Sequence, residues 1–432
     1  MDAWLTAVRM GLKTLVAATV RAETFRLALL VGAAGLSAVL MNLILAQALT
    51  AETFALVSLV QTAAFFVARF SSLGIAQASP RIVAIGIGQL REFPWTGLMK
   101  NTALRYIVPV SVVATLVLSV WLGFPVGTAI TVLLVMLAVA MGNLLGNMLR
   151  PTGRLLTGQA IVQAWRFCSF VLVGGTVLLL GGIGVSGVMS AFAVASLLVI
   201  GMSWAVVTSL PAGRERLDWE RVRNDGRAFL LVSVTLALAT YVDRLLAPRV
   251  IGMEAYASYA LVWWVVGMPF SIVESSIGFY LLPILRREPS VSRALRLLRS
   301  QTCQVLAAIT LIGLVGVWIT PRVVGVLYGD KYDVGGLLTA SIVLASVLRS
   351  VGVVPSAMIG AWGRVDQVRA LGAAGLLGVV VAAVGVVIGG SLGGGGGVAI
   401  GLAAGMTVRL LASIVLSRSA LENRRRVEKE SA

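Results

Sequence analysis

The hydrophobic positions of this chain fall into long uninterrupted stretches, separated by short segments that contain charged residues, Gly or Pro. Most stretches hold about twenty residues, which is the length an α-helix needs to cross about 30 Å of hydrocarbon. The pattern predicts twelve membrane-spanning helices with the ranges 27–48, 54–73, 104–122, 127–149, 158–180, 185–207, 229–247, 257–282, 303–320, 335–361, 371–388 and 398–416. A β-barrel would instead alternate in segments of about ten residues, a pattern that the chain lacks.

Composition supports an all-α polytopic membrane protein. Hydrophobic residues make up 58% of the chain and charged residues 12%, whereas a soluble domain carries about a quarter charged residues. The chain has no histidine, which excludes His-containing triads and the common His-based metal sites. Cys168 and Cys303 lie in apolar stretches and are expected to stay unpaired. The GxxxxGK[ST] loop is also missing, so we expect no nucleotide binding. We expect no enzyme, no metal site and no cofactor, and a coupling ion would be of unknown identity.

Basic residues concentrate in alternate connections between the predicted helices. The 35 Lys and Arg outnumber the 18 Asp and Glu, which gives a formal net charge of +17. If both termini are cytoplasmic, most bases lie on that side and the opposite connections hold only Arg249, Arg322 and Lys331. The positive-inside rule therefore orients the chain N-in and C-in. The charge points to anionic lipid headgroups as partners and gives no reason to expect nucleic acid.

The same pattern divides the chain into two halves of six helices. We expect an N-terminal cytoplasmic segment at 1–26, a first bundle at 27–210, a basic linker at 211–227, a second bundle at 228–417 and a basic tail at 418–432. The apolar face of the first segment is compatible with an interfacial helix, and a basic tail is the alternative.

Two segments of the halves resemble each other, at 51–83 and 253–287. Glu52 and Phe54 match Glu254 and Tyr256, and "SSLG" at 71–74 matches "SSIG" at 275–278, with an offset that changes from 202 to 204. Both segments cover the second span of their half. Because each half has an even number of spans, the repeat predicts a pseudo-two-fold axis along the membrane normal, with the site between the halves.

Four motifs carry a resemblance to a known family: "LTAETFALVSL" with "SLGIAQASPRIV", then "DRLLAPRVIGMEAYASYAL", "LLPILRR" and "VVGVLYGDKYDVGGLLTASIVLASVLRSV". Together they resemble the polysaccharide (lipid-linked oligosaccharide, O-antigen type) flippases of the MOP exporter superfamily. The resemblance implies two six-helix bundles around a cationic cavity in the bacterial inner membrane. It implies a flippase that moves a lipid-pyrophosphate-linked oligosaccharide to the outer leaflet for cell-surface polysaccharide biosynthesis, with membrane lipids and other polysaccharide assembly proteins as partners.

Ionisable residues within the predicted spans are the candidates for function. There are seven, namely Arg69, Arg166, Asp243, Arg244, Glu274, Arg349 and Arg409. Each costs about 2.5–3.5 kcal/mol at the bilayer centre, so we expect each to face the protein interior or a wet cavity. The five bases exceed the two acids, and Arg binds phosphate oxygens in a bidentate fork. The surplus therefore suits a pyrophosphate substrate.

The position of each charge along its helix predicts its role. We assign substrate binding to Arg69, Arg244 and Arg349, because Arg166 and Arg409 lie near enough to cytoplasmic helix ends to extend toward the interface. Gating or coupling falls to Asp243 and Glu274. Adjacent helix residues point about 100° apart, so Asp243 and Arg244 are expected to have separate partners.

One cross-half ion pair is predicted as well. Arg69 and Glu274 occupy nearly equivalent repeat positions and are predicted to pair when the cytoplasmic side closes. Secondary candidates for the site, chiefly for sugar contacts and with helix packing as the alternative, are Asn42, Gln61, Tyr259, Trp263 and Arg409.

Two other classes of protein remain as alternatives. A multidrug/cation antiporter of the MATE type would have the same fold, but it favours acids over bases in its cavity. A membrane glycosyltransferase or ligase needs catalytic groups on large extracytoplasmic loops. The longest such loop here spans 321–334, and its Asp330 and Asp333 look like turn residues.

Overall fold

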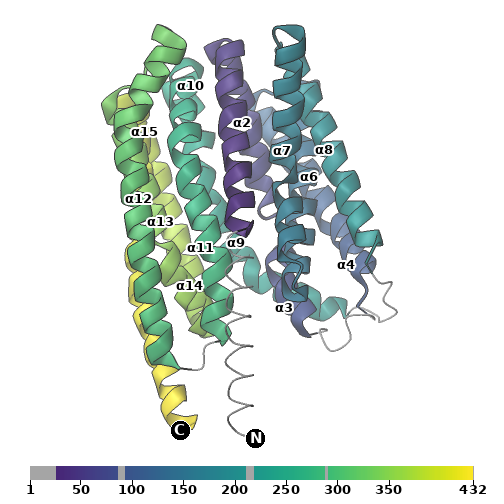
Figure 1. Cartoon of the computed structure of the whole chain (residues 1–432), viewed down its shortest axis with the longest axis vertical. Helices are drawn as coiled ribbons and strands as arrows, with labels where there is room; N and C mark the ends of the chain where they lie inside the picture. The colour runs from purple at the N-terminus through teal and green to yellow at the C-terminus, as the bar shows by residue number, and fades with distance from the viewer. Residues whose placement is uncertain (1–25, 86–92, 211–217, 288–289, 432) are drawn as a thin grey trace, which may run out of the picture.

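The computed structural model describes residues 26–85, 93–210, 218–287 and 290–431. These residues are almost entirely helical, and the predicted all-α fold is confirmed (Figure 1). The first half contains a helix at Arg26–Ala48, α2 (Ala51–Ala68), α3 (Ile75–Ile85), α4 (Trp95–Thr102), α5 (Val108–Leu122), α6 (Val126–Leu149), α7 (Leu155–Leu180) and α8 (Val185–Thr208). The second half contains α9 (Trp219–Ile251), α10 (Met253–Val262), α11 (Met268–Arg287), α12 (Val291–Tyr328), α13 (Gly336–Val351), α14 (Val353–Trp362) and α15 (Val365–Ser431).

Eleven helical stretches of the described chain are long and apolar enough to cross a membrane. The last, Asp366–Arg426, is 61 residues long, about three times the thickness of the hydrocarbon core. It is broken at Gly393 and Gly394, whose backbone angles are not helical, so it crosses twice. The described chain thus has the twelve crossings that the hydrophobic pattern predicts.

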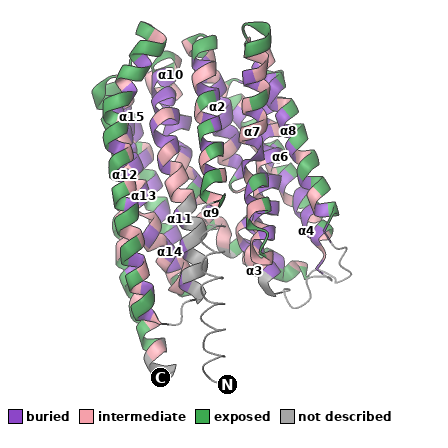
Figure 2. Ribbon diagram, viewed as in Figure 1, coloured by how far each residue is buried: buried purple, intermediate pink, exposed green. Residues whose placement is uncertain are grey.

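Helices in the interior are set apart from those at the surface by burial (Figure 2). Buried residues make up 67% of the apolar window of α2 and 72% of that of Met253–Ser275, but only 17% of that of Val291–Lys331. The two buried spans are the second of each half, and α2 packs against both α9 and α10. The interface between the halves therefore includes both segments in which the sequence shows its internal repeat, together with α9.

Several helix boundaries differ from those predicted. Residues 219–227 of the predicted linker form the first turns of α9, where the side chain of Asp218 accepts hydrogen bonds from the backbone N–H groups of Glu220 and Arg221. The predicted tail continues α15 as helix to Ser431. The third span is extended by α4, and the ninth starts at Val291. The N-terminal segment predicted at 1–26 lies, except for Arg26, outside the described residues.

The glycine-rich run at 389–397 connects the two crossings of α15. It forms the tip of a tight helical hairpin, in which Gly385 and Gly389 face Gly401 and Gly397 backbone to backbone. A Cβ atom on Gly401 would lie 2.1 Å from the carbonyl carbon of Gly385. Small residues let membrane helices approach closely enough for such contact.

A side chain at position 401 should force this hairpin apart. We expect Gly401→Ala to lower the free energy of unfolding by about 1–3 kcal/mol, the usual effect of overpacking. Thermal unfolding of the purified protein measures this effect. Gly175→Ala in α7 is the matched control, because its Cβ would meet nothing within 4 Å. An equal loss in both variants would contradict the backbone contact as the cause.

Candidate functional site

Asp243 of α9 lies at the centre of a polar network between helices. Its side chain is fully buried. Its Oδ2 accepts hydrogen bonds from the hydroxyl of Tyr259 at 2.5 Å and from the indole N–H of Trp263 at 3.0 Å. Its Oδ1 has no hydrogen-bond partner. The carboxylate is thus held by two neutral donors from α10 and the segment that follows it.

Arg244 directs its guanidinium elsewhere. It donates to the backbone carbonyl of Thr240 and lies over the rings of Tyr241 and Trp263, with its Cζ atom 4.7 Å and 4.0 Å from the two ring centroids. The Nε of Arg244 approaches the Oδ1 of Asp243 only to 3.9 Å, and neither atom has a hydrogen-bond partner. The two charges offset each other partly, while their hydrogen bonds go to different groups.

Glu274 and Arg349 form a partly buried ion pair between α11 and α13. The Nε of Arg349 donates to the Oε1 of Glu274 at 2.8 Å, and the hydroxyl of Ser350 donates to the same oxygen at 2.9 Å. A second nitrogen of Arg349 donates to the hydroxyl of Ser271 at 2.9 Å. Arg349, predicted as a free cavity arginine, is therefore neutralised within its own half.

The predicted pair between Arg69 and Glu274 is not formed in this conformation, in which Arg349 and Ser350 donate to Glu274. Arg69 lies at the C-terminal end of α2 and is exposed. The pair remains a prediction for a state that is closed on the cytoplasmic side.

Trp263 connects the two groups of charges. It begins a π-helical segment, Trp263–Gly267, and its ring lies 4.0 Å from Arg244 and 4.9 Å from Arg349. A Cβ atom on Gly267 would lie 2.1 Å from the ring of Trp263, so only glycine leaves room for it. Such π turns recur at functional sites in helices.

A methyl group at position 267 should displace the ring of Trp263. We expect Gly267→Ala to weaken the contacts of Trp263 with both arginines and to reduce activity several-fold while the protein still folds. The measurement is the activity of the variant relative to wild type, beside its thermal unfolding. Gly97→Ala is the control, because its Cβ would lie 3.6 Å from the nearest atom. Full activity in Gly267→Ala would contradict the importance of the ring position.

A cluster of three arginines surrounds Tyr241. Arg69, Arg166 and Arg244 all lie close enough to act electrostatically on its hydroxyl. Arg166 donates to the side chain of Gln163 at 2.7 Å. In the part of the chain that the structure describes, neither Arg69 nor Arg166 forms an ion pair. We call these four residues the arginine cluster, which draws on α2, α7 and α9 and so spans both halves.

The remaining predicted residues lie around these centres. Arg409 of α15 is near enough to the Glu274–Arg349 pair to interact with both charges. Asn42 and Gln61 are buried and hydrogen-bond to each other at 3.2 Å, as helix-packing residues do. A groove of about 450 Å³ on the outer face of α8 has only apolar lining residues: Val194, Leu197, Leu198, Gly201, Met202 and Ala205.

Sequence reasoning missed Tyr241 and the part played by Arg166. Tyr241 lies three residues before Arg244, so helical spacing places the two side chains on one face. That signal was available within "TYVDRLL". The sequence around Arg166 contains no comparable signal. Its position near a cytoplasmic helix end indicates only that its side chain can reach the membrane interface.

No protein-family model matches this chain, and no curated protein matches it by sequence. Solved structures do match. An inward-facing multidrug resistance MATE family transporter of the MOP superfamily aligns with a TM-score of 0.68 and 14% identity, over 92% of this chain and 99% of that chain. An outward-facing one aligns with a TM-score of 0.63 and 17% identity, over 93% and 96%.

A MOP superfamily transporter from Pyrococcus furiosus also aligns, with a TM-score of 0.62 and 16% identity, over 93% of this chain and 96% of that chain. At this level of identity the likeness concerns the fold. The chain has the fold of the MATE transporters of the MOP superfamily along nearly its whole length.

Proposed function

We propose that this protein is a secondary transporter that works by alternating access between its two halves. Its substrate is a lipid-pyrophosphate-linked oligosaccharide, which it flips from the cytoplasmic to the outer leaflet of a bacterial inner membrane. Both termini lie in the cytoplasm, in keeping with the basic connections. The fold supports transport, since the solved structures that it resembles are named as transporters.

The arginine cluster is the observation that carries the choice of substrate. Arg69 and Arg166 of the first half act electrostatically on Tyr241 of the second half and have no carboxylate partner among the described residues. Arg244 keeps only a distant one at 3.9 Å. An uncompensated group of guanidinium ions suits phosphate oxygens, which it binds with strong, charge-assisted hydrogen bonds. The Pyrococcus furiosus transporter is described as having a binding pocket of reverse polarity that suggests a different function, so this fold is not confined to one kind of substrate.

A leaflet-accessibility assay tests the proposal in a strain that lacks the protein. Wild type should restore exposure of the lipid-linked glycan on the outer leaflet. We expect Arg166→Gln to slow this translocation about tenfold, since a hydrogen bond to a charged group contributes about 1.5–3 kcal/mol. Arg105→Gln is the control, because Arg105 lies over the ring of Trp219 and is not one of the cluster residues. Undisturbed translocation in the deletion strain would refute the flippase.

A multidrug or cation antiporter is the second candidate. It is favoured by the names of the MATE structures and by Asp243, a fully buried acid beside two aromatic side chains. The two candidates predict different effects of the Arg166→Gln substitution on export. Arg166→Gln should impair export of an anionic lipid-linked glycan, whereas export of a cationic drug should be unchanged or faster because a repelling charge is gone. Faster export of a drug would favour the antiporter.

Asp243 carries the coupling ion in this proposal. It is the buried acid whose second oxygen has no hydrogen-bond partner, so it can accept a proton or a small cation. Glu274 is less suited, because Arg349 already neutralises it. One elementary charge that crosses about 100 mV contributes about 2.3 kcal/mol, which is enough to drive a flip against a gradient.

A further inference from the structure

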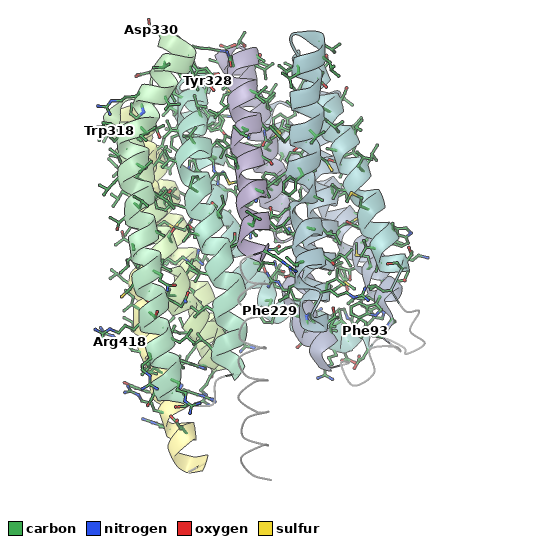
Figure 3. The ribbon with its side chains drawn as sticks, viewed as in Figure 1. Phe93, Phe229, Trp318, Tyr328, Asp330 and Arg418 are labelled. Atoms are coloured by element: carbon green, nitrogen blue, oxygen red, sulfur yellow. The ribbon has the colours of Figure 1, made fainter. Side chains whose placement is uncertain are left out.

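Hydrogen bonds between the halves concentrate at one end of the bundle. Tyr328 and Asp330 mark this upper end, opposite to the C-terminus (Figure 3). The hydroxyl of Tyr328 donates to the carbonyl of Leu43 at 2.9 Å, and that of Tyr332 donates to the carbonyl of Ala46 at 2.8 Å. Every one of these donors belongs to the second half and every acceptor to the first.

Lys331 makes the most extensive of these contacts. Its ammonium donates to the carbonyls of Ala46 at 2.7 Å and Gln47 at 3.3 Å, and also to that of Leu49. Ala46 and Gln47 belong to the last turn of the helix Arg26–Ala48, where carbonyls have no partner within the helix, and Leu49 follows directly after it. The C-terminus of a helix carries a partial negative charge and attracts cations. Lys331 therefore caps a helix of the opposite half.

Arg249 repeats the arrangement at a second helix. Its guanidinium, at the end of α9, donates to the carbonyl of Trp121 in the last turn of α5. The sequence places only three bases on this side of the membrane: Arg249, Arg322 and Lys331. Two of them cap helices of the other half. Arg322 instead donates to the carbonyl of Trp318 and lies over its ring, both within α12.

We infer that Lys331 and Arg249 form a latch that holds the two halves together at the upper end by capping helix C-termini of the first half. The latch must release once in each transport cycle, and in this respect the inference rests on the proposed function. Aromatic packing supports it, since the ring of Tyr332 meets that of Phe54 edge to face at 5.9 Å.

Distances between spin labels across the upper end test the latch directly. Cysteines at Glu52 and Leu337 are suitable, because both residues are exposed, lie on opposite halves, and are absent from the latch contacts. The full-length protein would carry Cys168→Ser and Cys303→Ser and be placed in lipid nanodiscs. We expect mainly the shorter distance in the background, and a several-fold larger population of the longer distance in Lys331→Met with Arg249→Met. Arg322→Met removes a base from the same side and should leave the distribution unchanged.

An unchanged distribution in the double variant would overturn the latch, and so would an equal shift in Arg322→Met. If the double variant does not fold, the latch can be tested in the spin-labelled protein that keeps Lys331 and Arg249. The charge–dipole contacts of Lys331 are exposed to solvent, so raising salt from about 0.05 M to about 1 M should increase the population of the longer distance. No response to salt would count against the latch. Because no substrate is present, the result stands apart from the flippase assay.

Discussion

Replacing Arg349 with methionine is expected to lower the free energy of unfolding by about 3–5 kcal/mol, the usual result of removing one partner from a buried ion pair. The side chains of Arg349 and Glu274 are only 8% and 17% exposed, so water cannot replace the missing charge well. Glu274 would keep just the hydroxyl of Ser350. Thermal unfolding in detergent or nanodiscs measures the loss.

Adding Glu274→Gln to Arg349→Met should restore most of the stability, because a neutral pair leaves no unpaired charge. Methionine also keeps the packing of the aliphatic part of Arg349. Arg322→Met is the control for loss of an arginine, since it lies outside this pair. If Arg349 serves mainly to neutralise Glu274, translocation should recover together with stability. Recovery of stability without translocation would instead support Arg349 as a substrate ligand.

The sequence predicts the fold well because the bilayer imposes a fixed length on each hydrophobic stretch. Hydropathy does not predict where a helix ends once it extends beyond the hydrocarbon core. Residues 219–227 are polar and continue α9 into the aqueous phase, where hydropathy carries no information. The local signal that did exist was Asp218, a typical N-cap residue followed by Glu220 in the first turn.

The hydrogen-bond and ion-pair partners of the site residues were much harder to predict from the sequence than the site residues themselves. Depth along a helix indicates that a charge such as Arg349 needs a partner, but not which helix it faces. Glu274 lies 75 residues away, and only the packing of α11 near α13 brings it to 2.8 Å. For Asp243 and Arg244, no knowledge of helix packing is needed to predict that their side chains point in different directions. Their separate hydrogen-bond partners follow from the geometry of one helix.

Replacing Asp243 with asparagine should abolish ion coupling and leave the fold intact. Tyr259 and Trp263 both donate to the same oxygen, so the amide oxygen of asparagine can accept both bonds. The amide NH₂ then takes the place of the oxygen that has no hydrogen-bond partner. If Asp243 carries one elementary charge across about 100 mV, its loss removes about 2.3 kcal/mol of drive, roughly fifty-fold in the gradient that transport can sustain.

Asp243→Ala separates this role from a structural one. It would leave two buried donors without an acceptor, at about 1–3 kcal/mol each, so it should unfold more easily than both wild type and Asp243→Asn. The measurement is translocation in proteoliposomes with and without ionophores, beside thermal unfolding. Glu254→Gln is the control, an exposed acid in the first turn of α10. If Asp243→Asn still responds to collapse of the ion gradient as wild type does, the carboxylate serves only to hold Tyr259 and Trp263, and coupling must reside elsewhere.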